Sequence, residues 1–192
     1  PNIDPNRIYV FGISEGGYGS QRLASYYADY WAGAGPMAGG EPLRNAPVEN
    51  CQHIAFSLLT GSQDYGFGRN QITMVAKEAF DQLEQQYPNT FKHRIELQQG
   101  RGHGINYNPT TSWLKAYRRN PRPQEFLWEN FPMGGRYRSG FYNLRVDESP
   151  KLPEVAATSP GATNDYDGRS NRYFHHLSMA NNEVRLTVQE VK

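Results

Sequence analysis

The chain lacks several sequence features that would assign it to a class of protein directly. Its 192 residues include a single cysteine, Cys51, so no internal disulfide is possible, and its place before an apolar run predicts a small core residue. The formal net charge is +1 and no basic block occurs, which argues against nucleic acid as the main partner. No apolar run approaches the roughly 20 residues that cross a bilayer, so we expect no membrane segment.

One motif stands out from this background. Residues 12–16 read Gly-Ile-Ser-Glu-Gly and directly follow the apolar run 8–11. A strand that turns sharply through glycines into a helix is how a hydrolase holds a serine exposed for attack. We expect Gly12, Gly16, Gly17 and Gly19 to leave room at this turn, and a helix to run from residue 15 to residue 28. Ser14 is therefore the candidate nucleophile.

A serine hydroxyl needs a base to take its proton and a third group to orient that base. In this class of fold the order along the chain is serine, acid, histidine. The buried strand predicted at 54–59 leads into a loop with Asp64, and the strand predicted at 93–97 leads into a loop with His103 between two glycines. Ligand-facing residues of open α/β sheets collect at such C-terminal strand ends. We expect Asp64 to be the acid and His103 the base.

The other four histidines are weaker candidates. His53 and His93 lie at the entrances of strands, at the end opposite the expected site, and we expect both to make structural hydrogen bonds. His175 and His176 lie in the C-terminal tail, and no further ligands at fixed spacing accompany them. We therefore expect no metal site.

The oxyanion hole is incomplete in the sequence. One donor would be the backbone N–H of Glu15, the residue after the nucleophile. The second donor normally comes from a loop several strands earlier, whereas only residues 1–7 precede the nucleophile strand. Loss of one donor typically costs on the order of a hundredfold or more in rate, so we expect this chain alone to be inactive. The open sheet edge beside the nucleophile strand is expected to promote aggregation unless it is covered.

Strand and helix patterns alternate up to about residue 120, which predicts an α/β fold with a parallel sheet. Residues 33–38 form a glycine- and alanine-rich candidate for a central strand, in which Pro36 is unusual. Residues 70–87 carry the strongest amphipathic helix pattern. A last helix is predicted at 111–119, after a proline.

The pattern changes after residue 120. Pro-Arg-Pro at 121–123 indicates a linker, and residues 149–167 read as a loop or disordered hinge. Three β-type runs occur, at residues 125–128, 139–146 and 182–188. We therefore divide the chain into an α/β core at 1–120 and a β-rich segment at 121–192, and we expect both to be incomplete.

These motifs resemble the α/β-hydrolase superfamily, and in particular secreted bacterial esterases of the polyhydroxybutyrate-depolymerase and feruloyl or acetyl-xylan esterase type. The likeness is carried by the nucleophile stretch 4–17, the acid loop 60–64 and the histidine loop 102–104. It implies the C-terminal half of an α/β-hydrolase sheet, from the nucleophile strand onward, with the family's upstream strands absent. Glu15 departs from the family, in which a small or apolar residue is more usual beside the nucleophile.

The resemblance implies a serine hydrolase that cleaves carboxylic esters through an acyl-enzyme, without a metal or cofactor, and that is secreted or periplasmic. Ser14 would attack the acyl carbon, His103 would act as base and then acid, and Asp64 would hold the imidazole. The substrate would be a small-molecule or polymeric ester. Three aromatic residues near the acid and histidine loops are equally candidates for substrate binding and for ordinary packing: Tyr65, Tyr107 and Trp113.

Two alternatives stay open. A serine peptidase of the same fold uses the same three motifs. A non-catalytic carbohydrate-binding protein on a lapsed hydrolase fold would keep the three residue types without an activated serine. The sequence does not indicate the oligomeric state.

Overall fold

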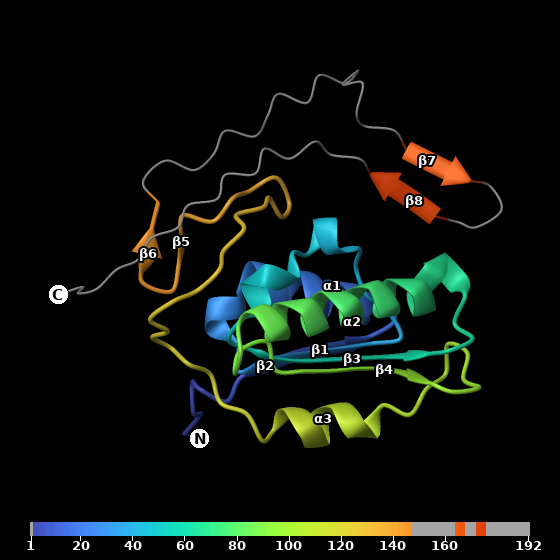
Figure 1. Cartoon of the computed structure of the whole chain (residues 1–192), viewed down its shortest axis with the longest axis horizontal. Helices are drawn as coiled ribbons and strands as arrows, with labels where there is room; N and C mark the ends of the chain where they lie inside the picture. The colour runs from blue at the N-terminus through green and yellow to red at the C-terminus, as the bar shows by residue number, and fades with distance from the viewer. Residues whose placement is uncertain (1, 147–163, 168–171, 176–192) are drawn as a thin grey trace.

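The computed structural model describes residues 2–146, 164–167 and 172–175. Its centre is a four-stranded sheet in the order β1-β2-β3-β4 with every neighbouring pair parallel (Figure 1). The strands are β1 (Tyr9–Ile13), β2 (Gly33–Met37), β3 (Ala55–Gly61) and β4 (His93–Gln98). Because parallel neighbours need a crossover connection, the chain passes over the sheet between strands. The predicted α/β fold with a parallel sheet is confirmed.

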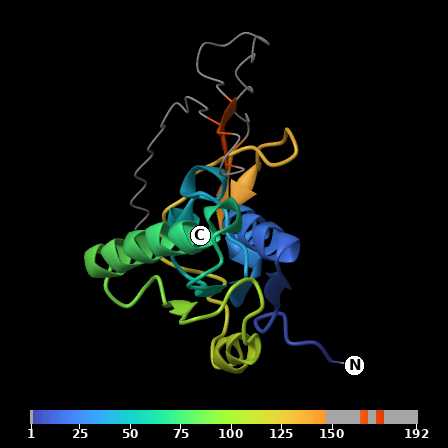
Figure 2. The same cartoon turned by 90° about the vertical axis from the view of Figure 1, so that its right-hand side faces the viewer.

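Helices cover both faces of this sheet. Figures 1 and 2 show α1 (Glu15–Tyr26) and α2 (Arg69–Gln86) on one face and α3 (Asn108–Leu114) on the other. The helix predicted at 70–87 is confirmed almost to the residue. The helix predicted at 111–119 is shifted toward the N-terminus and ends at Leu114 instead of residue 119. It begins earlier because Pro109 fits the first turn, where its missing N–H has no partner to lose.

Two glycines in β2 let α3 pack directly on the sheet. A Cβ at Gly33 would lie 2.9 Å from Leu114 Cδ2, and a Cβ at Gly35 would overlap Thr110 Cγ2. Since Thr110 and Leu114 are both buried, larger side chains in β2 would push α3 away. The prediction of a central strand tightly covered by helices is confirmed.

Pro36 stands inside β2 although a proline cannot donate to a sheet ladder. On one side β2 keeps its register with β1, where Pro36 pairs with Gly12. On the other side the register with β3 includes Ala34 and Met37 but neither Gly35 nor Pro36. The strand therefore tolerates Pro36 by interrupting the ladder locally.

The segment after α3 returns to the α1 and α2 side of the sheet (Figure 1) and adds to the main core. Phe141 is 1% exposed, and its ring stacks on Trp128 with centroids 5.5 Å apart. On the sheet, Phe56 of β3 stacks on Phe80 of α2 at 4.6 Å, and Phe56, Phe80 and Phe141 belong to one buried cluster. Described residues on both sides of position 120 thus share a core, while the domain boundary there stays a prediction.

Arg138 fastens this returning segment to the end of α1. Its guanidinium forms an ion pair with Asp29 and donates to the Tyr26 carbonyl at 3.0 Å. It also lies 5.1 Å from the ring centroid of Tyr27 and 5.5 Å from that of Tyr30. Arg138 and Asp29 side chains are 11% and 10% exposed, so the charges are paired where water has little access.

Residues 125–128 do not form the strand that their β-type composition predicts. Core side chains bind the backbone there instead: Leu127 N–H donates to Gln52 Oε1 at 2.8 Å, and Glu129 N–H donates to Asn50 Oδ1 at 2.6 Å. Because these amides are occupied, they do not pair with a neighbouring strand.

Two short antiparallel hairpins follow. The first pairs β5 (Gly140–Phe141) with β6 (Leu144–Arg145), and the second pairs β7 (Asn164–Asp167) with β8 (Arg172–His175). The strand predicted at 139–146 is split because Tyr142, with φ of 50°, turns the chain. β7 occupies part of the predicted loop, and the strand predicted at 182–188 lies outside the described residues.

Candidate active site

Ser14 occupies the turn between β1 and α1 in a conformation that L residues rarely adopt. Its φ is 57° and its ψ is −115°, which costs on the order of 1–3 kcal/mol and persists only when the surroundings enforce it. Its N–H donates to the Met37 carbonyl of β2 at 2.9 Å, and its carbonyl accepts from Gly17 N–H at 2.9 Å and Tyr18 N–H at 3.2 Å. Bonds to the neighbouring strand and helix therefore hold the serine in place.

The turn is tight enough to require glycine at two of the four predicted positions. A Cβ at Gly12 would overlap the Gly16 carbonyl, and a Cβ at Gly17 would lie 2.7 Å from the Met37 carbonyl. The expectation is wrong for Gly16 and Gly19, since a Cβ at either would meet nothing within 4 Å. Strand and helix thus cross most closely at Gly12.

Asp64 and His103 come from loops that lie against each other. The strands β3 and β4 are parallel neighbours, so their following loops leave the sheet side by side. A Cβ at Gly61 would overlap the carbonyls of Arg101 and Gly102, which shows how closely the acid loop and the histidine loop approach. This contact brings Asp64 within reach of His103.

A continuous hydrogen-bond chain joins the three predicted residues. His103 Nδ1 lies 2.8 Å from Asp64 Oδ2, and His103 Nε2 lies 3.0 Å from Ser14 Oγ. A carboxylate only accepts, so Nδ1 carries the proton and donates, and Nε2 is left to accept from the serine hydroxyl. Both distances fall within the range of about 2.6–3.2 Å at which a base activates a nucleophile.

The residues joined by these hydrogen bonds differ sharply in burial. Asp64 is 3% exposed, whereas the His103 side chain is 46% exposed. The orienting carboxylate is therefore shielded from water, while the imidazole and the serine remain accessible from outside.

Glu15 is the first residue of α1, and its side chain is exposed. The first N–H groups of a helix have no acceptor within the helix, and the N-terminus carries partial positive charge. The Glu15 N–H beside Ser14 is thus suited to an oxyanion, but this role stays a prediction.

The three aromatic candidates have different surroundings. Tyr65 directly follows Asp64 and is 71% exposed. Tyr107 packs against a small buried cluster that includes Ile105. The ring of Trp113 lies 4.6 Å from that of Tyr117 on α3 and its exit. Tyr107 and Trp113 have packing partners and Tyr65 is the most accessible of the three; a substrate role stays a prediction for all of them.

Sequence reasoning missed Arg69 and Tyr18. Arg69 Nη1 donates to Asp64 Oδ1 at 2.9 Å, and Arg69 Nε donates to Tyr18 Oη at 3.1 Å. Burial raises the pKa of Tyr18, and the Arg69 charge partly offsets that rise. One signal was available: a basic residue in the first turn of a helix opposes the helix dipole, so Arg69 at the start of α2 calls for a local partner.

The histidines at the strand entrances make the structural hydrogen bonds expected of them. His53 Nε2 donates to the Glu125 carbonyl at 2.7 Å, and burial lowers the pKa of His53 while this bond partly restores it. His93 lies 2.8 Å from the Phe91 carbonyl and 3.0 Å from Asp81 Oδ1.

Within the described ranges, no three His, Cys, Asp or Glu side chains gather in a way that could hold a metal ion. No helix there has both the length and the apolarity to span a membrane.

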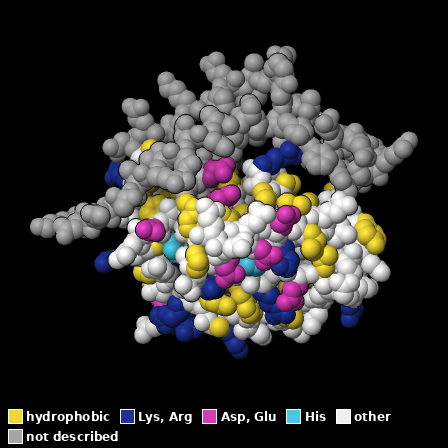
Figure 3. Space-filling view, in the orientation of Figure 1, with side chains coloured by type: hydrophobic (Ala, Val, Ile, Leu, Met, Phe, Trp, Pro, Cys, Tyr) yellow, Lys and Arg dark blue, Asp and Glu magenta, His cyan; other side chains and the backbone are white. Residues whose placement is uncertain are grey.

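On the face shown in Figure 3, positive and negative side chains are interspersed. Cys51 is 1% exposed, as expected of a core residue, and burial raises the pKa of its thiol.

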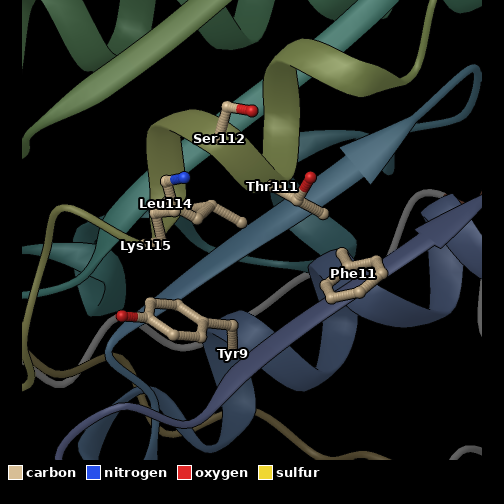
Figure 4. A pocket seen from close by; sticks show the side chains of 6 residues that line it. All are labelled: Tyr9, Phe11, Thr111, Ser112, Leu114 and Lys115. Carbon is tan, nitrogen blue, oxygen red and sulfur yellow. The ribbon is translucent and has the colours of Figure 1, made fainter.

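A hollow of about 330 Å³ lies apart from the triad, between β1 and α3 (Figure 4). Its lining consists of Tyr9, Phe11, Thr111, Ser112, Leu114 and Lys115. Tyr9 and Phe11 point into it from the same face of β1, as alternate residues of a strand do. Phe11 is 53% exposed, so apolar surface remains open beside the edge strand.

The described sheet is parallel, and Ser14 lies in a strained turn after β1. Asp64 follows β3 and His103 follows β4. This arrangement is typical of serine hydrolases with an α/β fold. The chain resembles esterase-type α/β-hydrolases. No protein-family model matches it.

Two curated proteins share short stretches with the chain. It is 49% identical over 39 residues to poly(3-hydroxyalkanoate) depolymerase C of Paucimonas lemoignei, and 36% identical over 62 residues to a protein described as an esterase, NocK, of Nocardia uniformis subsp. tsuyamanensis. These stretches are 20% and 32% of this chain but 9% and 18% of the two relatives. Among solved structures, a thermostable esterase aligns with a TM-score of 0.45 and 23% identity, covering 62% of this chain and 32% of the other.

Proposed function

We propose that Ser14, His103 and Asp64 form a catalytic triad and that the protein hydrolyses carboxylic esters through an acyl-enzyme. The observation that carries this proposal is the hydrogen-bond chain from Asp64 Oδ2 through His103 to Ser14 Oγ, with distances of 2.8 and 3.0 Å. The strained, backbone-held turn at Ser14 gives independent support, because such strain clusters at functional sites. The esterase and depolymerase names of the relatives favour ester substrates.

In the first half of the reaction, Ser14 Oγ attacks the ester carbonyl carbon while His103 Nε2 takes the serine proton. The tetrahedral intermediate places its negative oxygen near the Glu15 N–H. His103 then gives the proton to the leaving alcohol as the carbon–oxygen bond breaks, leaving an acyl group on Ser14. Asp64 orients the imidazole and stabilises its charged form without taking the proton.

In the second half, a water molecule replaces the alcohol. His103 takes a proton from the water as its oxygen attacks the acyl carbon, and the proton returns to Ser14 Oγ as the acid is released. No metal or cofactor enters these steps. Either a small or a polymeric ester fits this chemistry, and a second oxyanion donor stays a prediction.

The peptidase alternative uses the same steps on an amide, so the relatives' names are what favour the ester. The carbohydrate-binding alternative keeps the three residues without an activated serine, so labelling of Ser14 distinguishes it from the proposal. Secretion belongs to the same proposal, since the resemblance to secreted bacterial esterases implies it.

A fluorophosphonate probe tests the proposal on the full-length protein that carries this chain. We expect covalent labelling that maps to Ser14 and is lost in Ser14→Ala and His103→Ala. Ser112→Ala is the matched control, because Ser112 is an exposed serine that lines the separate hollow, and it should label like the wild type. A folded protein that fails to label would contradict the proposal.

Substrate preference is then measured by comparing aryl ester and aminoacyl-amide turnover by the wild-type protein that has not been treated with the probe. Faster ester turnover supports an esterase. Faster amide turnover would support the alternative, a serine peptidase that uses the same triad.

A further inference from the structure

The Asp64 carboxylate is bound on both of its oxygens. Oδ2 accepts from His103 Nδ1 at 2.8 Å, and Oδ1 accepts from Arg69 Nη1 at 2.9 Å. The Asp64 and Arg69 side chains are 3% and 11% exposed, so this ion pair lies largely out of water. Removing one partner of such a pair leaves the other charge without compensation.

Arg69 also joins the acid loop to the helix that follows the nucleophile. Its Nε donates to Tyr18 Oη of α1 at 3.1 Å, and Tyr18 N–H in turn donates to the Ser14 carbonyl at 3.2 Å. One guanidinium therefore links Asp64 to the first turn of α1 through two different nitrogens, which the planar fork of arginine allows and a lysine ammonium does not.

The loop between Asp64 and Arg69 is shaped around this guanidinium. A Cβ at Gly66 would lie 2.8 Å from Arg69 Nη1, so a side chain there would displace the group that binds Asp64. Phe67 adopts a left-handed φ of 54°, which is an outlier for a bulky residue. Its ring centroid lies 4.9 Å from the guanidinium carbon, within the range of a cation–π contact.

We propose that Arg69 is a positioning residue for the hydrolysis. By holding Oδ1, it prevents the Asp64 carboxylate from turning, so that Oδ2 stays aimed at His103 Nδ1 and the imidazole stays aimed at Ser14. This inference rests on the proposed triad. It goes beyond the triad in assigning the orientation of the acid to a residue that touches neither the serine nor the histidine.

Loss of Arg69 should reduce the turnover number more than it changes substrate affinity. Misplacement of a reacting group by about 1 Å can cost on the order of a hundredfold in rate. We therefore expect Arg69→Met to lower kcat by roughly 10- to 100-fold with KM nearly unchanged. Arg69→Lys should recover part of the loss, because an ammonium keeps the charge but not both hydrogen bonds.

The test uses the full-length protein with an aryl ester and compares Arg69→Met, Arg69→Lys and Tyr18→Phe with the wild type. Tyr18→Phe removes the Nε acceptor and leaves the Asp64 bond, so its kcat should fall less than that of Arg69→Met. The matched control is Arg94→Met, since Arg94 pairs with Glu96 at 3.0 Å on β4, and its kcat should equal that of the wild type. Equal kcat for Arg69→Met and Arg94→Met would overturn the inference.

A double-mutant comparison separates positioning from general loss of stability. If Arg69 acts through Asp64, then Arg69→Met should cause little further loss of kcat in an Asp64→Asn background. A loss as large as that in the wild-type background would mean that Arg69 acts elsewhere, and would overturn the inference. Thermal unfolding of each variant confirms that the folded protein is being compared.

Proton NMR keeps this inference distinguishable from the proposed function. The proton on His103 Nδ1, hydrogen-bonded to a carboxylate, should give a far-downfield resonance, assigned by its absence in His103→Ala. If Arg69 positions Asp64, this resonance shifts or broadens in Arg69→Met and stays in place in Arg94→Met; an unchanged resonance overturns the inference. A protein that shows the Arg69-dependent resonance but no labelling of Ser14 would keep the positioning contact and refute only the proposed hydrolysis.

Discussion

The strands β1 and β3 each lead into a residue of the candidate site, yet they lie in opposite surroundings. All seven residues of β3 are buried, so the packed core supports Asp64. In β1, at one end of the described sheet, Phe11 and Ile13 are 53% and 46% exposed. Ser14 is instead fixed by backbone bonds to β2 and α1. Within the described residues, Ser14 is therefore held by bonds of its own backbone rather than by burial of the strand before it.

The largest expected effect is on kcat and concerns Asp64, the site residue that follows the buried strand β3. Asp64→Asn should lower kcat by about ten-thousandfold, because the amide favours the wrong imidazole tautomer. Steady-state kinetics with an aryl ester measure this loss. Asp81→Asn is the control, since Asp81 is an exposed carboxylate on α2; a similar loss there would mean that the effect is not specific to the site.

The next prediction compares the two strands directly. Phe56→Ala in β3 should lower the free energy of unfolding by about 3–5 kcal/mol, since Phe56 is fully buried and stacked on Phe80. Phe11→Ala in β1 should change it by about 0.5 kcal/mol or less, as for an exposed position. Urea unfolding followed by circular dichroism gives both values. Comparable losses would show that β1 is buried in solution.

A smaller effect concerns the amino ends of the strands. Burial holds the pKa of His53 below its ordinary value near 6.5, so below that pH the unfolded state binds more protons than the folded state. Stability should therefore fall as the pH drops through 6.5 toward the lowered pKa. His53→Gln keeps a donor for the Glu125 carbonyl and should flatten this part of the profile of unfolding free energy against pH. An unchanged slope would show that His53 does not carry it.

The smallest effect is expected at the exposed edge. An unpaired edge strand can pair with other chains, and a charge on it discourages such pairing. Phe11→Lys should lower the concentration-dependent light scattering of the purified chain while barely changing its unfolding temperature. Thr111→Lys, on the α3 side of the same hollow, is the control for added charge away from the strand. Equal scattering by wild type and Phe11→Lys would contradict the prediction.

Much of the site could be predicted from sequence because its residues follow local signals. Ser14, Asp64 and His103 each come directly after an apolar strand pattern, and neighbouring parallel strands bring such loops to one edge of the sheet. The same signals predicted β1 to β4 and α1 to α3, with shifts at their ends, but not the short strands β5 to β8 as the structure has them. Burial of β3 and the small residues of β2 were likewise visible as a continuous apolar run and a glycine pattern.

What could not be predicted depends on contacts between distant residues. The bond from Arg69 to Asp64 requires a left-handed Phe67 between them, which no periodicity indicates. The segment after Pro121 looked like a linker to separate β structure, but Gln52 and Asn50 bind its backbone from far earlier in the chain. Side-chain hydrogen bonds of this kind leave no spacing pattern to recognise.

The attachment of the 126–142 segment to α1 has a consequence for synthesis. Arg138 and Phe141 complete the surroundings of α1, although they emerge from the ribosome long after that helix. Contacts between residues so far apart in sequence slow folding, and domains fold as their last core residues become available. The nascent chain must therefore carry an unfinished core until position 142 has left the exit tunnel. Until then, the apolar cluster that Phe141 completes stays open to chaperones that bind apolar segments.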